Sequence, residues 1–201
     1  MDPKTAERFN LSTPSLEGFL YPDTYSFSRI DAEEKIVERM VGRFFEKFTN
    51  EYREELKANG WTLEKLVTLA SIVEKETGVG DERGLVSSVF HNRLKKRMRL
   101  QSDPTTIYGI RDFNGNITKA DLQRYTPYNT YVIPGLPPGP IANPGLASLM
   151  AALRPTQSDF LYFVSNNQGS HFFSKTYGQH AGHVNKFQKR SISKNGSRKR
   201  R

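Results

Sequence analysis

Apolar residues at helical spacing organise the first sixty positions of the chain. Asp31 and Glu34 have the spacing of a capping box, which predicts that a helix starts there. An apolar stripe follows, with one residue about every four positions: Ile36, Met40, Phe44 and Phe48. Asn59-Gly60 then supplies residues that tolerate the left-handed conformation of a helix end. The pattern predicts one long helix between these two signals.

Two more helices are predicted in the middle of the chain. Thr62 starts one that runs from Leu63 to about Thr77, and the glycines at 78 and 80 stop it. Its buried face is predicted to consist of four residues: Leu66, Leu69, Ala70 and Val73. Apolar positions at the same spacing predict the next helix, from about Asp81 to Lys96.

Turn-forming residues interrupt the helical pattern after this point. Residues 112–116 have the composition of a loop, and the proline- and glycine-rich segment 135–145 is predicted to be rigid and non-helical. At the end of that segment Asn143 is predicted to cap a helix whose first residue is Pro144. Arg154-Pro155 ends this helix, because a residue before proline avoids the helical conformation.

Aromatic residues mark the last elements. Segments 160–165 and 171–174 are predicted strands, and the polar turn at 166–169 joins them as a hairpin. Residues 180–188 are predicted to form a closing helix. The chain is therefore expected to be an α+β protein, mainly helical, with one small antiparallel β-element near its end.

The charge distribution divides the chain into three parts. Of its 30 Lys and Arg residues, eight lie between Lys186 and Arg201, which leaves residues 1–185 with a net charge of +1 out of the total of +9. We expect a polar lead-in at 1–15, one domain at 16–188 and a basic tail at 189–201. The tail is either simply solvated or attracted to an anionic membrane surface or wall polymer. The nearly neutral body disfavours nucleic-acid binding.

The amino-acid composition excludes further classes of protein. The chain has no cysteine, which rules out disulfide frameworks and thiolate chemistry. No run of apolar residues is long enough to span a bilayer, and the chain does not start with a signal peptide. We therefore expect this chain to be soluble, and any segment that exports or anchors it to lie outside the chain.

Two glutamates flank the apolar face of the helix predicted at 63–77. On a helical wheel Glu76 falls between Ile72 and Leu69, and Glu74 falls at the opposite edge of the face. A carboxyl group at the boundary of an apolar face is partly dehydrated, which raises its pKa toward the range of a general acid. The alternative is that both are surface acids beside a core helix, and the spacing alone does not choose between these readings.

Seven segments in a fixed order carry a resemblance to a known family. They are 16–25 (LEGFLYPDTY), 69–77 (LASIVEKET), 89–94 (VFHNRL), 98–109 (MRLQSDPTTIYG), 128–131 (YNTY), 135–145 (GLPPGPIANPG) and 161–164 (LYFV). Over residues 16–188 the chain resembles the catalytic domain of the MltG (YceG-like) endolytic lytic transglycosylases, which cut peptidoglycan glycan strands. The resemblance implies a lysozyme-like catalytic helix, and it implies that the second glutamate of the Glu-Lys-Glu-Thr motif, Glu76, is the catalytic acid.

The family mechanism uses one carboxyl group where most glycosidases use two. It implies that Glu76 protonates the glycosidic oxygen between N-acetylmuramic acid and N-acetylglucosamine, while the substrate acetamido oxygen stabilises the anomeric cation. The Glu76 carboxylate then takes the proton of the muramic acid C6 hydroxyl, which closes on C1 as a 1,6-anhydro ring. No water is added and no cofactor is needed.

The other polar residues of these motifs are candidates for the wall of a substrate cleft. They are Glu74, Gln101, Asp103, Tyr108, Tyr128, Asn129, Tyr131 and His171. For Asp103 the alternative is a turn former before Pro104, and for Glu74 it is a solvated ion pair. His180 and His183 share a predicted helix face, but no third ligand accompanies them, so a metal site is not expected.

The resemblance also implies a setting and a set of partners. Family members act at the outer, periplasmic face of the bacterial cytoplasmic membrane, held there by an N-terminal anchor that this chain lacks. Peptidoglycan strands are the expected substrate and peptidoglycan synthases are expected partners. A catalytically silent glycan-binding scaffold is the alternative from another class of protein, and the complete Glu-Lys-Glu-Thr motif favours the enzyme.

Overall fold

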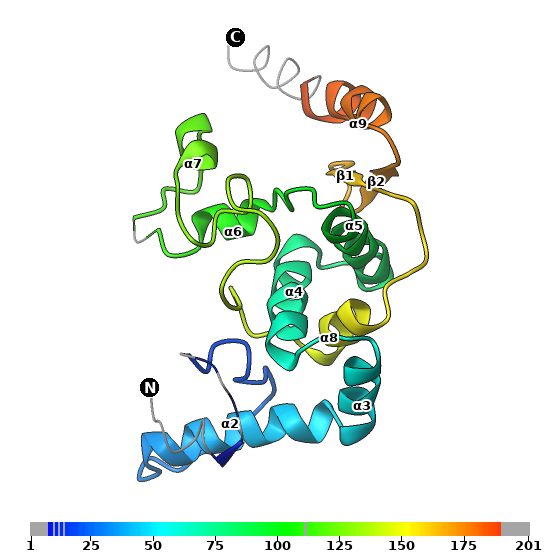
Figure 1. Cartoon of the computed structure of the whole chain (residues 1–201). Helices are drawn as coiled ribbons and strands as arrows, with labels where there is room; N and C mark the ends of the chain where they lie inside the picture. Colours follow the sequence, from blue (N-terminus) through cyan, green and yellow to red (C-terminus); the bar gives the residue numbers. More distant parts are fainter. Residues whose placement is uncertain (1–7, 10, 12, 14, 111, 190–201) are drawn as a thin grey trace.

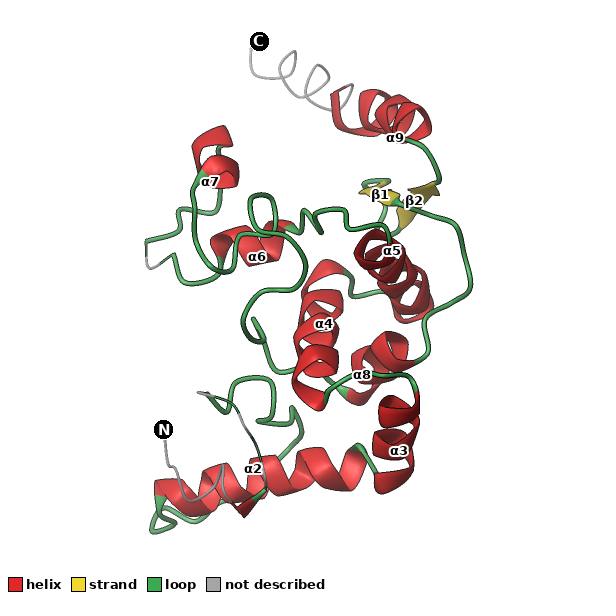
Figure 2. Ribbon diagram, viewed as in Figure 1, coloured by secondary structure: helices red, strands yellow, loops and turns green. Residues whose placement is uncertain are grey.

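The computed structural model describes residues 8, 9, 11, 13, 15–110 and 112–189. Most of the expected lead-in, and residues 190–201 of the expected basic tail, lie outside the described residues. Within the described part, helices dominate, and the two strands form one antiparallel sheet (Figure 2). The expected α+β class, mainly helical with a small β-element, is confirmed.

The elements are arranged around one central helix, α4 (Leu63–Glu76) (Figure 1). Helices α5 (Arg83–Lys95) and α8 (Leu146–Leu153) pack against it. Helices α2 (Glu33–Lys47) and α3 (Asn50–Ala58) lie at one end of the molecule, and the hairpin and α9 lie at the other. The remaining elements are η1 (Gly80–Glu82), α6 (Asp103–Ile107), α7 (Lys119–Gln123), β1 (Tyr162–Ser165), β2 (His171–Ser174), α9 (Tyr177–Val184) and the short π-helix η2 (Asn185–Lys189).

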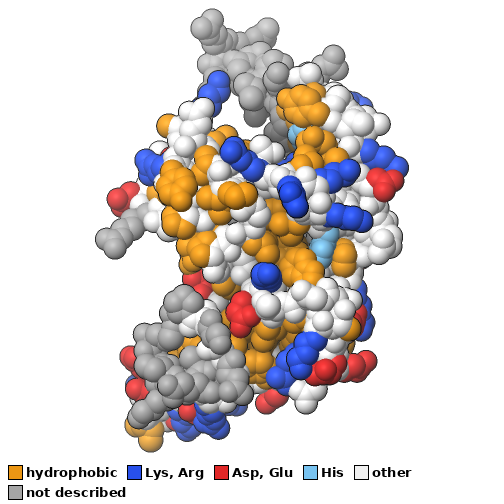
Figure 3. Space-filling view, in the orientation of Figure 1, with side chains coloured by type: hydrophobic (Ala, Val, Ile, Leu, Met, Phe, Trp, Pro, Cys, Tyr) orange, Lys and Arg blue, Asp and Glu red, His pale blue; other side chains and the backbone are white. Residues whose placement is uncertain are grey.

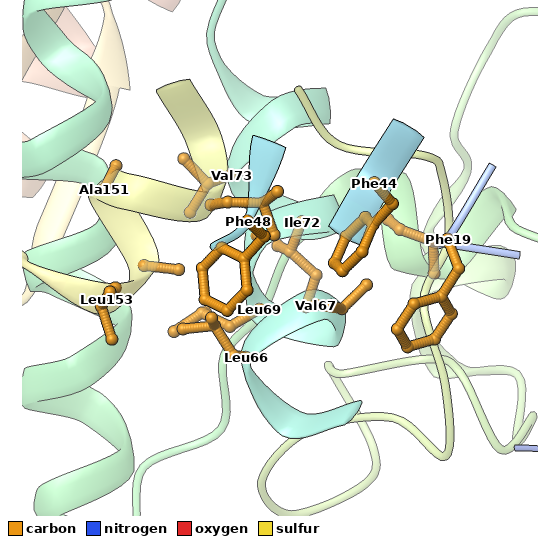
Figure 4. Packing of buried hydrophobic residues seen from close by; sticks show 14 of the residues in the cluster. Phe19, Phe44, Phe48, Leu66, Val67, Leu69, Ile72, Val73, Ala151 and Leu153 are labelled. Atoms are coloured by element: carbon orange, nitrogen blue, oxygen red, sulfur yellow. The ribbon is translucent and has the colours of Figure 1, made fainter. Parts of the chain in front are cut away.

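Helix α4 is buried on all sides along its centre. Every residue from Leu66 to Val73 is buried, which extends the face predicted from periodicity to the whole circumference. In Figure 4 its apolar side chains lie between Leu153 of α8 on one side and Phe19 and Phe44 on the other. Its two polar side chains in this stretch are satisfied: the hydroxyls of Thr68 and Ser71 donate to the carbonyls of Glu64 and Thr68 at 2.7 Å each. A helix held this firmly gives a fixed position to the residue at its end, Glu76.

The single helix predicted from Asp31 to Asn59 is wrong at two points. Asp31 does not cap it, because its carboxylate accepts hydrogen bonds from the Ser28 N–H at 2.8 Å and the Lys35 ammonium at 2.6 Å. Helix α2 starts after Ala32, and the chain leaves the helical conformation at Phe48 before α3 starts. The break lets the chain turn while the Phe48 ring stays fully buried. The end at Gly60, with φ of 72°, is confirmed.

The predicted role of Asn143 as a helix cap is also wrong. Helix α8 starts at Leu146 with Gly145 at its N-cap. The Asn143 side-chain oxygen instead accepts hydrogen bonds from the Gly18 N–H at 2.6 Å and the Leu20 N–H at 3.3 Å. It therefore holds the irregular segment after Leu16 against the 135–145 loop, a contact that no local sequence pattern reveals.

Gly18→Ala is expected to destabilise the protein by about 2 kcal/mol or more. Gly18 has φ of 90°, and an added Cβ would lie 2.5 Å from Cγ of Pro140 and 2.6 Å from Cγ1 of Val67. Denaturation with urea measures the loss. Gly78→Ala is the control, because a Cβ at Gly78 would have no atom within 4 Å. Equal midpoints for the two variants would show that the segment around Gly18 yields without cost.

The predicted hairpin is confirmed. Tyr162 pairs with Ser174 and Ser165 pairs with His171 across the two strands. The turn between them contains two residues with positive φ, Asn167 at 62° and Gly169 at 89°. Helix α9 starts at Tyr177, earlier than predicted, because Thr176 and Gln179 form a capping box.

Candidate active site

A cleft of about 720 Å³ lies at the C-terminal end of α4. It is bounded by α4, α5, the 98–103 segment, the hairpin and the start of α9. Its lining residues are Glu76, Arg93, Met98, Leu100, Gln101, Asp103, Tyr131, Tyr162, Phe163, Val164, Ser165, His171, Tyr177 and His180. The aromatic side chains among them offer flat apolar surfaces between polar groups, a combination typical of ligand-binding clefts.

Glu76 is the last residue of α4 and borders this cleft. Its Oε1 accepts a hydrogen bond of 2.5 Å from the Ser102 hydroxyl. Burial raises the pKa of Glu76 from 4.5 to about 7, and the negative charge of Asp103 acts in the same direction; the Ser102 hydrogen bond and the Arg93 charge oppose this rise. A carboxyl group with this pKa is available in both protonation states near neutral pH, which suits a group that first donates and then accepts a proton.

Ser102→Ala is expected to raise the pKa of Glu76 further, by about one unit. The reason is that the hydroxyl stabilises the carboxylate form, and the variant loses this stabilisation while burial remains. A carbon-13 NMR titration of the glutamate side-chain carboxyls measures the change. Ser88→Ala serves as the control, because Ser88 bonds to the Leu85 carbonyl on α5 instead. An unchanged or lower pKa in Ser102→Ala would contradict this account of Glu76.

Arg93 of α5 joins three parts of the cleft wall. Its Nε donates to the Leu161 carbonyl at 2.7 Å, and one terminal nitrogen donates to the Leu100 carbonyl at 2.8 Å and to Oε1 of Gln101 at 3.2 Å. Its guanidinium lies 5.1 Å from the centre of the Tyr162 ring, and the residue is 7% exposed. Sequence reasoning quoted Arg93 within a motif but gave it no role, so the structure adds it to the site.

The segment before α6 brings two predicted residues to the cleft. Gln101 has φ of 51°, and its backbone N–H donates to the Thr130 carbonyl at 3.1 Å. Asp103 accepts a hydrogen bond of 2.6 Å from the hydroxyl of Tyr131, which also lines the cleft. A second carboxylate therefore shares the cleft with Glu76, although no pattern in the sequence pairs the two.

His171 also lines the cleft, where it contacts a residue that sequence reasoning missed. Its Nδ1 lies 2.6 Å from Oε2 of Glu82, at the end of η1. Sequence spacing does not reveal this contact, because Glu82 and His171 are 89 positions apart.

The structure does not bring the other four predicted residues into this cleft. The rings of Tyr108 and Tyr128 contact each other at a tilt of 46° with centres 4.5 Å apart, and both residues border a separate cavity of about 640 Å³. Asn129 is fully buried, and its amide donates to three backbone carbonyls: those of Asp121, Leu122 and Arg124. Oε2 of Glu74 accepts a hydrogen bond of 3.1 Å from the Gly145 N–H, at the start of α8. Asn129 and Glu74 thus have structural partners.

Neither a metal centre nor a membrane-spanning helix is present among the described residues. Among them, no group of three or more His, Asp or Glu side chains is placed to hold a metal ion. No helix in that part of the chain is long and apolar enough to cross a bilayer. On the face in Figure 3, several Lys and Arg side chains lie near one another across the upper half of the molecule, among apolar side chains.

Comparisons with known proteins agree on one family. An endolytic murein transglycosylase of Bacillus subtilis is 41% identical over 172 residues, which cover 85% of this chain and 47% of that protein. One of Streptococcus pneumoniae is 34% identical over 180 residues, which cover 85% of this chain and 32% of that protein. The chain thus spans about a third to a half of the length of these curated relatives. A crystal structure of a YceG-like protein from Listeria monocytogenes matches with a TM-score of 0.80 and 39% identity, covering 90% of this chain and 63% of that one. Since the YceG-like family model also matches residues 2–186, the chain belongs to the YceG-like family.

Proposed function

We propose that this chain is the catalytic domain, residues 16–188, of an endolytic lytic transglycosylase. It cleaves the β-1,4 bond between N-acetylmuramic acid and N-acetylglucosamine in peptidoglycan strands. The observation that carries the proposal is Glu76, whose pKa is raised to about 7 at the edge of a cleft lined with aromatic and polar side chains. The names of the relatives from Bacillus subtilis and Streptococcus pneumoniae support the substrate class.

The mechanism needs one group that changes its protonation state twice. Protonated Glu76 donates its proton to the glycosidic oxygen as the bond to C1 of N-acetylmuramic acid breaks. The acetamido oxygen of the same sugar stabilises C1, and the Glu76 carboxylate then removes the proton of the C6 hydroxyl as that oxygen bonds to C1. Glu76 ends protonated, as it began, and the two products together have the atoms of the substrate.

The Ser102 hydroxyl supports both steps. It donates to the carboxylate of Glu76 and so limits the rise of its pKa that burial causes. Without it Glu76 would remain protonated at a higher pH and would be a weaker acid. The balance of burial against this hydrogen bond keeps both forms accessible near neutral pH.

Hydrolysis is the second candidate for the reaction, and the presence of Asp103 in the cleft favours it. Glycosidases that add water use a second carboxylate, and Asp103 lines the same cleft and acts electrostatically on Glu76. In that case Asp103 would activate a water molecule and the products would carry reducing ends. Asp103 accepts a hydrogen bond of 2.6 Å from the Tyr131 hydroxyl, which orients its carboxylate in the cleft.

Digestion of purified glycan strands in heavy-oxygen water distinguishes these reactions. Transglycosylation gives internal cuts with 1,6-anhydro ends that are lighter by one water than reducing ends and carry no label. Labelled reducing ends would overturn the proposal in favour of hydrolysis, with Asp103→Asn as the next variant to test. If neither product forms, a silent glycan-binding scaffold is the better interpretation.

We extend the proposal to the setting of the reaction. Strands that are still being made emerge at the outer face of the bacterial cytoplasmic membrane, where an internal cut would release or terminate them. Peptidoglycan synthases are the partners that this position implies, and attachment to the membrane would hold the enzyme there. Cross-linking in intact cells tests both, since synthases should be captured on the periplasmic side of the membrane.

A further inference from the structure

His171, which lines the cleft, forms a histidine–carboxylate pair with Glu82. His171 is the first residue of β2, and Glu82 is the last residue of η1. Nδ1 of His171 lies 2.6 Å from Oε2 of Glu82, and the backbone N–H of His171 donates to Oε1 at 2.9 Å. Both side chains are 14% exposed. His171 thus occupies both carboxylate oxygens of Glu82 through its ring and its backbone N–H. These two contacts fix the position of the imidazole ring.

This contact also determines which ring nitrogen carries the proton. A carboxylate is only an acceptor, so Nδ1 of His171 must be the donor. In the neutral ring Nε2 is then an acceptor. Among the described residues no hydrogen bond to Nε2 of His171 is recorded, and the residue lines the cleft. Nε2 is therefore the polar atom that His171 can offer to a ligand.

The surroundings of the ring favour a role in binding. The His171 ring packs edge-on against the Phe163 ring, with centres 5.5 Å apart, and Phe163 lines the same cleft. If His171 served only to link η1 to β2, a side chain with a single donor at the position of Nδ1 would be sufficient. An imidazole adds a second nitrogen, and His171 and Glu76 both line the same cleft.

We propose that Glu82 and His171 form a glycan-binding pair, in which Glu82 positions His171 and Nε2 of His171 accepts a hydrogen bond from an N–H or O–H group of the sugar. The proposal rests on the proposed function, because its ligand is the same N-acetylated glycan. It assigns Glu82 as a positioning residue, since Glu82 acts through His171.

Two substitutions of His171 distinguish a role in glycan binding from a role in holding Glu82. In His171→Asn the side-chain amide places a donor near the Nδ1 position, so the contact with Glu82 is kept and the Nε2 acceptor is lost. In His171→Gln the longer amide reaches the Nε2 position and the contact with Glu82 is lost. His183→Asn is the matched control, because His183 also contacts a protein group through Nδ1, the Ser174 hydroxyl at 3.3 Å, and is not among the residues lining the cleft.

The test measures binding of purified, uncross-linked glycan strands by calorimetry, with each change made in a Glu76→Gln background to prevent cleavage. Adding His171→Asn should weaken binding about three- to tenfold, as expected for one lost hydrogen bond, without lowering the thermal midpoint. Adding His183→Asn should leave binding unchanged. Equal affinities of the His171→Asn and His183→Asn proteins would overturn the pair. Failure of the Glu76→Gln parent to bind glycan at all would overturn the proposed function together with it.

The tautomer provides a readout that does not depend on glycan. Nitrogen-15 NMR of histidine-labelled protein should show a protonated Nδ1 and an unprotonated Nε2 at His171. Glu82→Gln can turn an amide N–H toward Nδ1, so it should shift His171 toward the opposite tautomer and raise KM more than it lowers kcat. An unprotonated Nδ1 in the wild-type protein would overturn the assignment, even if His171→Asn fails to fold.

Discussion

Glu76→Gln is expected to lower the rate of glycan cleavage by about 10²–10⁴-fold while the protein keeps its fold. The amide has nearly the same shape and can accept the hydrogen bond from Ser102, but it cannot deliver an acidic proton to the glycosidic oxygen. The release of soluble muropeptides from purified peptidoglycan measures the loss. Circular dichroism and the thermal midpoint establish that the variant is folded.

Glu74→Gln is the matched control for this variant. Glu74 lies on the same helix, two residues earlier, but its carboxylate accepts from the Gly145 N–H and does not line the cleft. We expect its cleavage rate to stay close to that of the wild type. Loss of activity in Glu74→Gln together with its retention in Glu76→Gln would reverse the assignment of the acid.

Glu76→Gln should also increase the stability of the protein at alkaline pH. A carboxyl whose pKa is raised on folding stabilises the folded state below its unfolded pKa of 4.5, and this contribution is lost as the pH rises through about 7. Glu76→Gln removes this loss, so at pH values above about 8 it should be more stable than the wild type, by up to about 3 kcal/mol. Below the unfolded pKa the two proteins should have similar free energies of unfolding. Such a trade of stability for function is common for catalytic acids in dehydrated sites.

Helix α4 could be predicted because its apolar spacing and its cap at Thr62 are local signals. The same spacing placed both Glu74 and Glu76 at edges of the apolar face, and only the resemblance to the family selected Glu76 as the acid. The predicted hairpin is confirmed for a similar reason, since its turn and alternating strands lie within fifteen residues. Elements set by neighbouring residues are the ones that sequence reasoning recovered.

The rest of the site depends on contacts between distant segments. Ser102 lies 26 positions from Glu76, and only the packing of the 98–103 segment against α4 brings its hydroxyl to the carboxylate. Asn129 is expected to line the cleft because it lies in a recognisable motif, but it is buried. Its side chain donates hydrogen bonds to backbone carbonyls. The break at Phe48 has no glycine or proline to mark it, and the ring of Phe48 is fully buried there. Periodicity carries no information about any of these three features.

Arg93→Met is expected to cost about 3–5 kcal/mol of stability and to disorder the cleft wall. Methionine keeps much of the apolar stem but removes every donor, so the carbonyls of Leu161 and Leu100 lose their buried partner. Loss of the positive charge should also raise the pKa of Glu76, because Arg93 lowers it in the wild type. Urea denaturation measures the first effect, and the carboxyl titration measures the second.

Arg154→Met is the control that isolates burial as the cause. Arg154 also makes several hydrogen bonds, which reach both carboxylate oxygens of Glu55, but its side chain is 52% exposed. An exposed pair of this kind contributes at most about 1 kcal/mol, so Arg154→Met should be nearly neutral. The contrary outcome is that Arg93→Met lowers the free energy of unfolding by no more than Arg154→Met does. In that case water or a rearranged side chain provides hydrogen bonds to the acceptors of the three segments that meet at Arg93. The cleft wall would then be held by the packing of Tyr162 and the hairpin against α5, and not by the guanidinium.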